Sequence, residues 1–399
     1  MYYLYLQSAL HSDAILKRKA EEFFAAVERK SGTSFVPGTA AEVGAEAVSV
    51  IYIATGGTAG MVKAALNELG ENIIIVTSSI QNSLSASMES LTYINQLGRN
   101  ARLVHGEPDE AAQIVASAVC AAKAVKSLRG MRLGLVGKPS DWLISTAVDY
   151  ASLKEKTGIC VEEVSMDELL SEIAEGSYEE NDYCRELMEK DFDKAQIKQA
   201  LEIYGAFRRI VDKHGFDGVS VRCFDLLSAV KNTGCLGLAI LNACGIYSAC
   251  ESDLPSLISM AIMGRVSGSP VFMCNPSRVD RKKNEITFAH CTLPLNMAEK
   301  YSLDTHFESR IGVAVSADIP LGKATVFKAS ADLGHYFVSS GEIVETLHDE
   351  NLCRTQIKLR CSADTDSFLN SHVGNHYLVC LGDWEEELRL AMELLGAGK

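Results

Sequence analysis

The segment AVSVIYIATGGTAG, residues 47–60, has the pattern of a β-strand that leads through a glycine turn into an α-helix. Its first half is apolar and β-branched, and MVKAALNEL (61–69) follows with helical periodicity. The same pattern continues with a strand at 72–79, a helix at 83–98, a strand at 101–106 and a helix at 109–129. Strands and helices that alternate at this spacing predict a parallel sheet with crossover helices.

The α/β pattern restarts near residue 128. A strand that enters a loop is expected at 131–142, and further strands at 161–166 and 216–225. A long helix is expected at 192–214, and a helix pair or surface excursion in the acidic stretch 167–192. After about residue 265, short strands alternate with turn residues, as in an antiparallel barrel or sandwich. We therefore expect an α/β fold of two Rossmann-like doubly wound domains, residues 1–128 and 129–245, followed by a mostly antiparallel, barrel-like β domain, residues 246–399.

Composition narrows the classes of function. With 52 acidic and 38 basic residues the net charge is −14, which does not favour nucleic acid as a partner. The chain has no run of about 18 uninterrupted apolar residues and no signal-peptide pattern, so we expect neither a membrane span nor secretion. Its 12 cysteines form no CxxC pair, and several lie in apolar runs. These features predict a reduced, cytoplasmic protein.

Three motifs lie where predicted strands end. TGGTAG (55–60) matches neither GxGxxG nor GxxxxGK[ST], so a tight turn is favoured over an anion-binding loop. GKPSDW (137–142) fits a plain turn and a binding loop equally well. In VRCFD (221–225), Arg222 and Asp225 fit either a substrate contact or an internal salt bridge.

The segment NACGIYSACESDLPSL (242–257) carries two carboxylates in an otherwise apolar region. Buried carboxylates are paired, hydrogen-bonded or bound to a metal, because an unpaired one is costly. Asp253 precedes Pro255 and is a candidate N-cap of a helix. Glu251 has no such structural explanation, so we favour a functional role for it.

Four histidines lie further along the chain in strand or loop settings: His290, His306, His372 and His376. A single histidine on a strand is more often a satisfied core or surface residue than a metal ligand. Several histidines together with a buried glutamate nevertheless favour a carboxylate–imidazole metal site, of a type that suits Mn, Co, Zn or Fe.

An ordered series of motifs spans nearly the whole chain: ATGGT, QNSLSASMESLTYINQLGRNARLVHG, LRGMRLGLVGKPSDWL, VRCFDLL, GCLGLAILNACGIYSACESDLPSL, PVFMCNPSRVD, FAHCTLP, THFESRIGV, LCRTQI and GNHYLVCLGDW. In this series the chain resembles the L-fucose isomerase/L-arabinose isomerase superfamily, particularly its short fucose-isomerase-like branch. The resemblance implies two Rossmann-like domains and a C-terminal β domain. It also implies an assembly of several identical subunits, typically a hexamer, in which the first domain reaches a neighbour's site.

The resemblance implies a metal-dependent aldose–ketose isomerase that works on an open-chain sugar through a cis-enediol. The cofactor would be a divalent metal, most often manganese, with cobalt, magnesium and zinc as alternatives. By resemblance, Glu251 is a metal ligand and catalytic acid/base, and His376 and His290 are further ligands. A metal polarises the carbonyl, and a carboxylate takes and returns the proton.

The chain departs from the family at the second acid. Asn275 stands where fucose isomerases carry an aspartate, and an amide can bind a metal through oxygen but cannot act as a base at neutral pH. Asp253 is therefore a candidate second catalytic acid. A different metal-assisted reaction on a sugar, such as epimerisation or hydrolysis, is an alternative. A non-catalytic sugar-binding protein is another.

Residues near the proposed site in sequence are candidates for binding the sugar's hydroxyls or an anionic tail. They are Trp142, Arg222, Arg278, His306 and Glu308. The two arginines make a phosphorylated or sulfonated sugar worth testing as the substrate.

Overall fold

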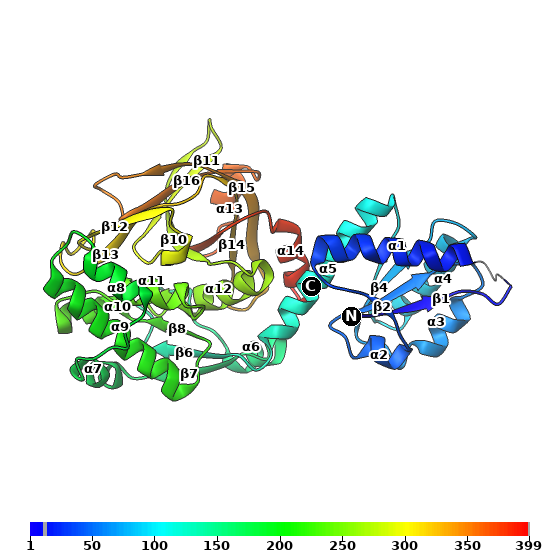
Figure 1. The fold of residues 1–399 in the computed structure, drawn as a ribbon, viewed down its shortest axis with the longest axis horizontal. Helices are drawn as coiled ribbons and strands as arrows, with labels where there is room; N and C mark the ends of the chain where they lie inside the picture. Colours follow the sequence, from blue (N-terminus) through cyan, green and yellow to red (C-terminus); the bar gives the residue numbers. More distant parts are fainter. Residues whose placement is uncertain (11–13, 398–399) are drawn as a thin grey trace. The chain divides into compact units, whose positions relative to one another are not determined.

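The computed structural model describes residues 1–10 and 14–397. Over these residues the chain forms two compact units, Met1–Lys126 and Ser127–Lys399 (Figure 1).

The first unit is built on a five-stranded parallel sheet of order β2-β1-β3-β4-β5. Its strands are β1 (Tyr2–Leu6), β2 (Val36–Pro37), β3 (Ser49–Ile53), β4 (Asn72–Thr77) and β5 (Asn100–Val104). Its helices are α1 (Ala14–Ser31), α2 (Ala40–Gly44), α3 (Ala59–Ala65), α4 (Ser83–Gln96) and α5 (Pro108–Leu128). Isoleucines of β3 and β4 pack with Val62 and Leu66 in the core, which explains the β-branched runs of the sequence.

Helix α5 is the one described helix that is long and apolar enough to cross a membrane by length and composition alone. Within its most apolar window, 61% of the helix is buried in the structure. Core helices pass the same test, so this is weak support for a membrane span.

The second unit contains a four-stranded parallel sheet of order β7-β6-β8-β9. Its strands are β6 (Arg132–Val136), β7 (Cys160–Val164), β8 (Gly218–Val221) and β9 (Tyr247–Cys250). The helices of this part are α6 (Tyr150–Thr157), α7 (Met166–Ala174), α8 (Asp182–Glu189), α9 (Lys194–His214), α10 (Cys223–Val230), α11 (Cys235–Ala243) and α12 (Leu254–Ser267). Helices α7 and α8 confirm a helix pair in the acidic stretch.

A closed antiparallel barrel of six strands follows in the same unit, with strand order β10-β11-β16-β15-β14-β17 (Figure 1). Its strands are β10 (Phe272–Asp280), β11 (Glu285–His290), β14 (Gly322–Ala329), β15 (Tyr336–Leu347), β16 (Thr355–Cys361) and β17 (Tyr377–Leu381). A separate pair is formed by β12 (Lys300–Asp304) and β13 (Ala314–Asp318). The remaining elements are the 3₁₀ turn η1 (Leu295–Met297) and helices α13 (Thr365–Asn370) and α14 (Glu385–Leu394).

Helix α12 lies between the parallel sheet and the barrel (Figure 1). It contacts β8 and β9 on the sheet side and β14 and β17 on the barrel side. All of its residues except Arg265 are buried. A helix enclosed in this way has to be apolar on every face, which explains the almost uncharged sequence around residues 242–265.

The structure confirms the mixed α/β class, the parallel sheets and the antiparallel barrel near the C-terminus. The segments expected as a second and a third domain, 129–245 and 246–399, lie within one compact unit. Helix α12 links the two segments, because it contacts β8 of the first as well as the barrel strands β14 and β17 of the second.

Candidate active site

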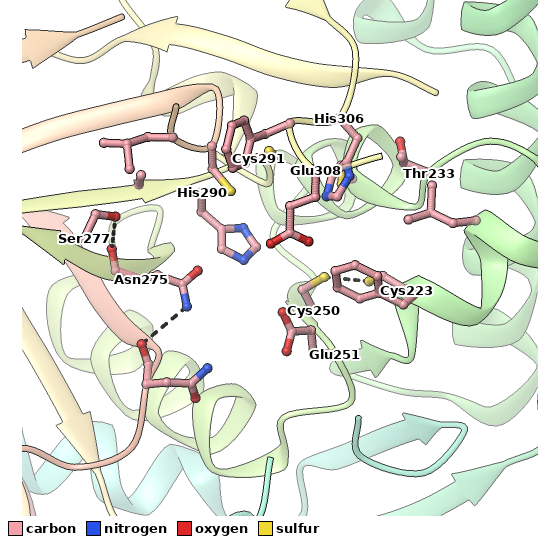
Figure 2. A pocket seen from close by; sticks show the side chains of 18 of the residues that line it. Cys223, Thr233, Cys250, Glu251, Asn275, Ser277, His290, Cys291, His306 and Glu308 are labelled. Carbon is pink, nitrogen blue, oxygen red and sulfur yellow. Dashed lines mark hydrogen bonds between the residues drawn. The ribbon is translucent and has the colours of Figure 1, made fainter. Parts of the chain in front are cut away.

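A cavity of about 320 Å³ lies in the second unit and is lined by residues of both sheets (Figure 2). One wall comes from the carboxyl ends of β6, β8 and β9, where ligands commonly bind in parallel sheets. The other walls come from β10, β11 and the loop between β12 and β13. Prominent lining residues are Trp142, Cys223, Phe224, Cys250, Glu251, Asn275, Ser277, His290, His306 and Glu308.

Glu251 enters the cavity from a strained turn at the end of β9. Both Glu251 (φ 62°) and Ser252 (φ 51°) have left-handed backbone conformations, which cost about 1–2 kcal/mol per residue outside glycine. Backbone hydrogen bonds hold the turn: Glu251 O accepts from Ser140 N, and Ser252 N donates to Val221 O, both at 3.1 Å. Strain that the surrounding structure maintains in this way is typical of functional sites.

The carboxylate of Glu251 is oriented by an indole. Trp142 Nε1, from the loop after β6, donates to Glu251 Oε2 at 2.6 Å. Burial alone raises the pKa of Glu251, but His376 and the Trp142 N–H outweigh it, so that the pKa is lower than usual. Glu251 is therefore ionised at neutral pH, as a metal ligand or a general base has to be.

His376 lies directly before β17 and is completely buried. Its Nδ1 donates to Asp253 Oδ2 at 2.8 Å, and its Nε2 lies 3.7 Å from Glu251 Oε1. Although burial lowers the pKa of His376, the carboxylates of Asp253 and Glu251 raise it above its usual value. Nε2 is one of the few buried polar side-chain atoms that have no hydrogen-bond partner among the described residues.

Asp253 is buried behind His376 and is not among the residues that line the cavity. It caps α12, as its sequence context indicates, because Oδ1 accepts from Ser256 N at 2.8 Å. Lys328 Nζ lies 3.6 Å from the same oxygen. Burial alone would raise the pKa of Asp253, but Lys328 and His376 hold it well below its usual value.

His290, the last residue of β11, contributes a neutral imidazole. Its Nδ1 is bonded to Thr292 Oγ1 at 2.9 Å, and its ring centroid lies 5.8 Å from that of His376. Burial, together with the charge of His376, lowers the pKa of His290 to about 3. The ring is therefore uncharged at neutral pH and suited to donate to, or bind, a ligand in the cavity.

The loop between β12 and β13 supplies His306 and Glu308. His306 Nδ1 is bonded to Ser309 Oγ at 3.0 Å, and its ring packs edge-on against Phe224, which in turn packs against Trp142. Figure 2 shows the Glu308 carboxylate pointing into the cavity, toward His290 and Glu251. Two carboxylates, Glu251 and Glu308, are thus the acidic groups in the cavity lining.

Asn275 on β10 also lines the cavity, and its Nδ2 donates to the carbonyl oxygen of Asn375 at 3.4 Å. The backbone of Asn275 pairs with Ala289 in the register of β10 and β11, and both residues line the cavity together with His290. An amide here can offer an oxygen to a ligand but cannot accept a proton.

Besides Asp253 and His376, the candidates Arg222, Arg278 and His372 lie outside the cavity lining. Arg222 forms ion pairs with Asp225 at 3.0 Å and Asp141 at 3.1 Å. Arg278 pairs with Asp349 at 2.6 Å, and its side chain is 55% exposed. His372 bonds the Leu369 carbonyl oxygen on the surface. The structure thus brings together Trp142, Glu251, Asn275, His290, His306 and Glu308, with His376 and Asp253 behind them.

A divalent metal would need several donor atoms close to one point. Within residues 1–10 and 14–397, no group of three or more His, Cys, Asp or Glu side chains could hold one ion. Glu251 Oε1 nevertheless lies 3.7 Å from His376 Nε2, an imidazole nitrogen that has no hydrogen-bond partner among the described residues. The carboxylate behind the histidine is a common feature of metal-binding histidines. The pair offers two ligand types that divalent metals accept, a carboxylate oxygen and an imidazole nitrogen.

Sequence patterns did not single out Phe224 and Cys223, although both belong to the VRCFD motif. The motif contributes to the cavity through these two residues, whereas Arg222 and Asp225 pair with each other. Lys328 was also missed. A single lysine in the otherwise uncharged strand segment ATVFKA (324–329) is a signal that could have identified it, because a buried ammonium needs a partner.

The four curated relatives found by comparison with known proteins are all sulfoquinovose isomerases. No protein-family profile matches the chain. A sulfoquinovose isomerase of Clostridium sp. (strain MSTE9) is 26% identical over 337 residues, which cover 79% of this chain and 75% of that protein. Sulfoquinovose isomerases of Priestia aryabhattai and Priestia megaterium (strain ATCC 12872 / QMB1551) are each 21% identical over 326 residues, covering 77% of this chain and 73% of the relative.

Among solved structures, a D-threo-3-hydroxyaspartate dehydratase from Delftia sp. HT23 aligns with 94% of this chain and 90% of its own. The TM-score is 0.15 and the identity 8%, so this alignment carries no argument about fold or function.

Proposed function

We propose that this chain, which four curated relatives identify as an isomerase, interconverts an anionic aldose and the matching ketose with the help of a divalent metal. The relatives are named for sulfoquinovose, and that sugar is the first substrate to test. The observation that carries the proposal is the buried, unpartnered His376 Nε2, which lies 3.7 Å from Oε1 of Glu251, a residue that lines a cavity of about 320 Å³.

Glu251 and His376 would hold the metal, with manganese as the first candidate and cobalt, magnesium and zinc as alternatives. A divalent metal bound there would polarise the substrate carbonyl and stabilise the negative charge that develops on its oxygen. Trp142 keeps the Glu251 carboxylate aimed at the cavity, and Asp253 fixes the His376 ring. Neutral His290 is placed to donate a hydrogen bond to a substrate oxygen.

Proton transfer between C1 and C2 needs a base that reaches the substrate. Asp253 is 1% exposed, and both of its oxygens are engaged by Ser256, Lys328 and His376, so a sugar in the cavity cannot reach it. Glu308 lines the cavity and points into it. We therefore assign the second carboxylate of the reaction to Glu308, with Glu251 as metal ligand and partner in moving the proton through a cis-enediol.

An anionic substrate also needs a partner for its charge. None of the described residues that line the cavity is a lysine or an arginine. This supports the expectation of a homo-oligomer, typically a hexamer, in which a neighbouring subunit completes the site. Arg222 and Arg278 stay candidates for this contact only if their present ion pairs open.

The proposal is tested by incubating the purified protein with sulfoquinovose in D₂O, after treatment with a chelator and with Mn²⁺ added back. NMR spectroscopy should show a ketose, with deuterium at C1 or C2, only in the sample that contains Mn²⁺. Conversion that is equally fast without the metal would overturn the metal assignment. Absence of both ketose and exchange with every anionic aldose tested would overturn the aldose–ketose reaction.

Epimerisation is the second candidate function, because Asn275 replaces an acid that the resemblance would require. The same NMR experiment separates the two reactions. A C2 epimer that forms before any ketose accumulates would favour the epimerase.

A further inference from the structure

Strand β14 carries a lysine in the interior of the second unit. The Lys328 side chain is 3% exposed, and its Nζ donates to Ser256 Oγ at 2.5 Å. Its other polar contact is Asp253 Oδ1 at 3.6 Å. Burying an ammonium group is costly unless it is paired, so the lysine is retained here against a considerable desolvation penalty.

Asp253 lies between Lys328 and His376, and each of its two carboxylate oxygens faces one of them. Oδ1 faces Lys328 and accepts from the backbone N–H of Ser256, whereas Oδ2 accepts from His376 Nδ1. Without the lysine, Oδ1 of Asp253, whose residue is only 1% exposed, would keep the backbone N–H of Ser256 as its one partner among the described residues. A buried charge that loses its partner has to move, take up a proton or admit water.

The His376 ring depends on this carboxylate for its orientation. Among the described residues its Nδ1 has Asp253 as its one short polar contact, and its Nε2 has no hydrogen-bond partner. Anything that loosens Asp253 therefore lets the ring turn, and Nε2 then no longer faces Glu251.

We propose that Lys328 is a positioning residue of the active site: it holds the Asp253 carboxylate in place, and Asp253 in turn fixes His376 with Nε2 directed at Glu251. Lys328 is not among the residues that line the cavity, so it acts through Asp253 and not on the substrate. The consequence for metal binding rests on the proposed function, but the orientation of the ring does not.

Strand β14 offers a matched control. Lys323 lies on the same strand, but its side chain is 77% exposed and it pairs loosely with Asp383 at 3.8 Å. Lys328→Met and Lys323→Met make the same chemical change at a buried and at an exposed position. Circular dichroism and the melting temperature establish that each variant is folded.

The first measurement needs no metal. In ¹H–¹⁵N NMR spectra of histidine-labelled protein, the His376 Nδ1–H should give a downfield, slowly exchanging signal, assigned by its loss in His376→Gln. Lys328→Met should broaden or remove this signal, and Lys323→Met should leave it unchanged. An unchanged signal in Lys328→Met would overturn the proposal, whatever the metal dependence of the enzyme.

The second measurement is the affinity for Mn²⁺, determined by calorimetry. Removing a residue that orients a metal-binding histidine typically weakens metal affinity about 10–100-fold. We expect a loss of Mn²⁺ affinity in that range for Lys328→Met and a loss of less than about 2-fold for Lys323→Met. If the wild-type protein does not bind Mn²⁺, the metal assignment of the proposed function fails, while the NMR signal still decides the role of Lys328.

A charge-balanced variant covers the case in which Lys328→Met does not fold. Asp253→Asn combined with Lys328→Met leaves no unpaired charge at this position. If the lysine acts through Asp253, adding Lys328→Met to Asp253→Asn should change Mn²⁺ affinity by less than about 2-fold. A further 10-fold loss in the double variant would show that Lys328 acts by another route and would contradict the proposal.

Discussion

The His376 Nε2 atom lies 3.7 Å from Glu251 Oε1, although the two residues are 125 positions apart in the chain. The histidine comes from the start of a barrel strand, and the glutamate from the end of a strand in the parallel sheet. The pair therefore exists only because the barrel and the parallel sheet pack on opposite sides of α12.

Replacing Glu251 by glutamine should remove the negative charge from this pair while keeping the side chain's size. We expect kcat to fall by at least about 100-fold, because a carboxylate that moves protons contributes 10²–10⁴-fold. Mn²⁺ affinity, measured by calorimetry, should fall as well. The exposed Glu350, changed to glutamine in the same way, should behave as wild type. Normal metal binding and turnover in Glu251→Gln would refute the site assignment.

Glu308→Gln separates proton transfer from metal binding. The cavity keeps its shape and Glu251 keeps its place, so Mn²⁺ affinity should stay within about 2-fold of wild type. The loss of a general base should lower kcat about 10²–10⁴-fold and abolish deuterium exchange at C2. A variant with unchanged kcat and a raised KM would instead identify Glu308 as a residue that binds sugar hydroxyls.

The two tryptophans of the chain form a matched pair for testing the orientation of Glu251. Trp142 Nε1 donates to the Glu251 carboxylate, whereas Trp384 Nε1 donates to the Leu381 carbonyl oxygen. A hydrogen bond to a charged group contributes about 1.5–3 kcal/mol, so Trp142→Phe should lower kcat/KM by roughly 10–150-fold. Trp384→Phe should have little effect on kcat/KM. Equal effects of both changes would mean that Trp142 contributes packing alone.

His214 should make the stability of the protein depend on pH. Its ring lies between Glu162 Oε1 at 2.7 Å and Glu168 Oε1 at 2.8 Å, and these carboxylates, Glu168 foremost, raise its pKa. A raised pKa in the folded state means that the stabilisation is complete below the unfolded-state value, near 6.5, and disappears as the pH rises through the folded-state value.

His214→Gln should therefore lower the free energy of unfolding by about 1 kcal/mol at pH 5.5 and by much less at pH 9. Urea denaturation at both pH values measures the difference. The exposed His372, whose ring bonds the Leu369 carbonyl oxygen, provides the control substitution. A larger loss of unfolding free energy at pH 9 than at pH 5.5 would contradict the predicted pH dependence.

Periodicity and turn residues were sufficient for most of the architecture. The β-branched runs at β3 and β4 and the glycine turn after β3 identify parallel strands, because a strand buried on both faces needs apolar residues throughout. Turn residues at regular intervals after residue 265 indicated the antiparallel strands. Closure into a six-stranded barrel depends on pairings between distant strands, such as β10 with β17, which spacing alone does not determine.

The candidate site was predictable where a residue conflicted with its surroundings. Glu251 stood out as a carboxylate in an apolar segment, and Asp253 as a helix cap, and both assignments depend only on neighbours in sequence. The internal salt bridge between Arg222 and Asp225, one of the two alternatives offered by the sequence, is confirmed. The partners Asp141 of Arg222 and Asp349 of Arg278 were not predictable, because they lie in other segments. Lys328 could be noticed in the sequence, but its partner could not.

The sequence by itself determined the alternation of strands and helices over residues 47–129, the strand-rich character after residue 265, and a carboxylate in the core next to a helix cap. These are local properties, set by side-chain periodicity and by the cost of burying charge. Only the tertiary structure decided that Glu308 and not Asp253 reaches the cavity, and that Lys328 supports Asp253. Such assignments depend on which way a side chain points and on partners about 70 or more residues away, and the packing of the barrel against α12 sets both.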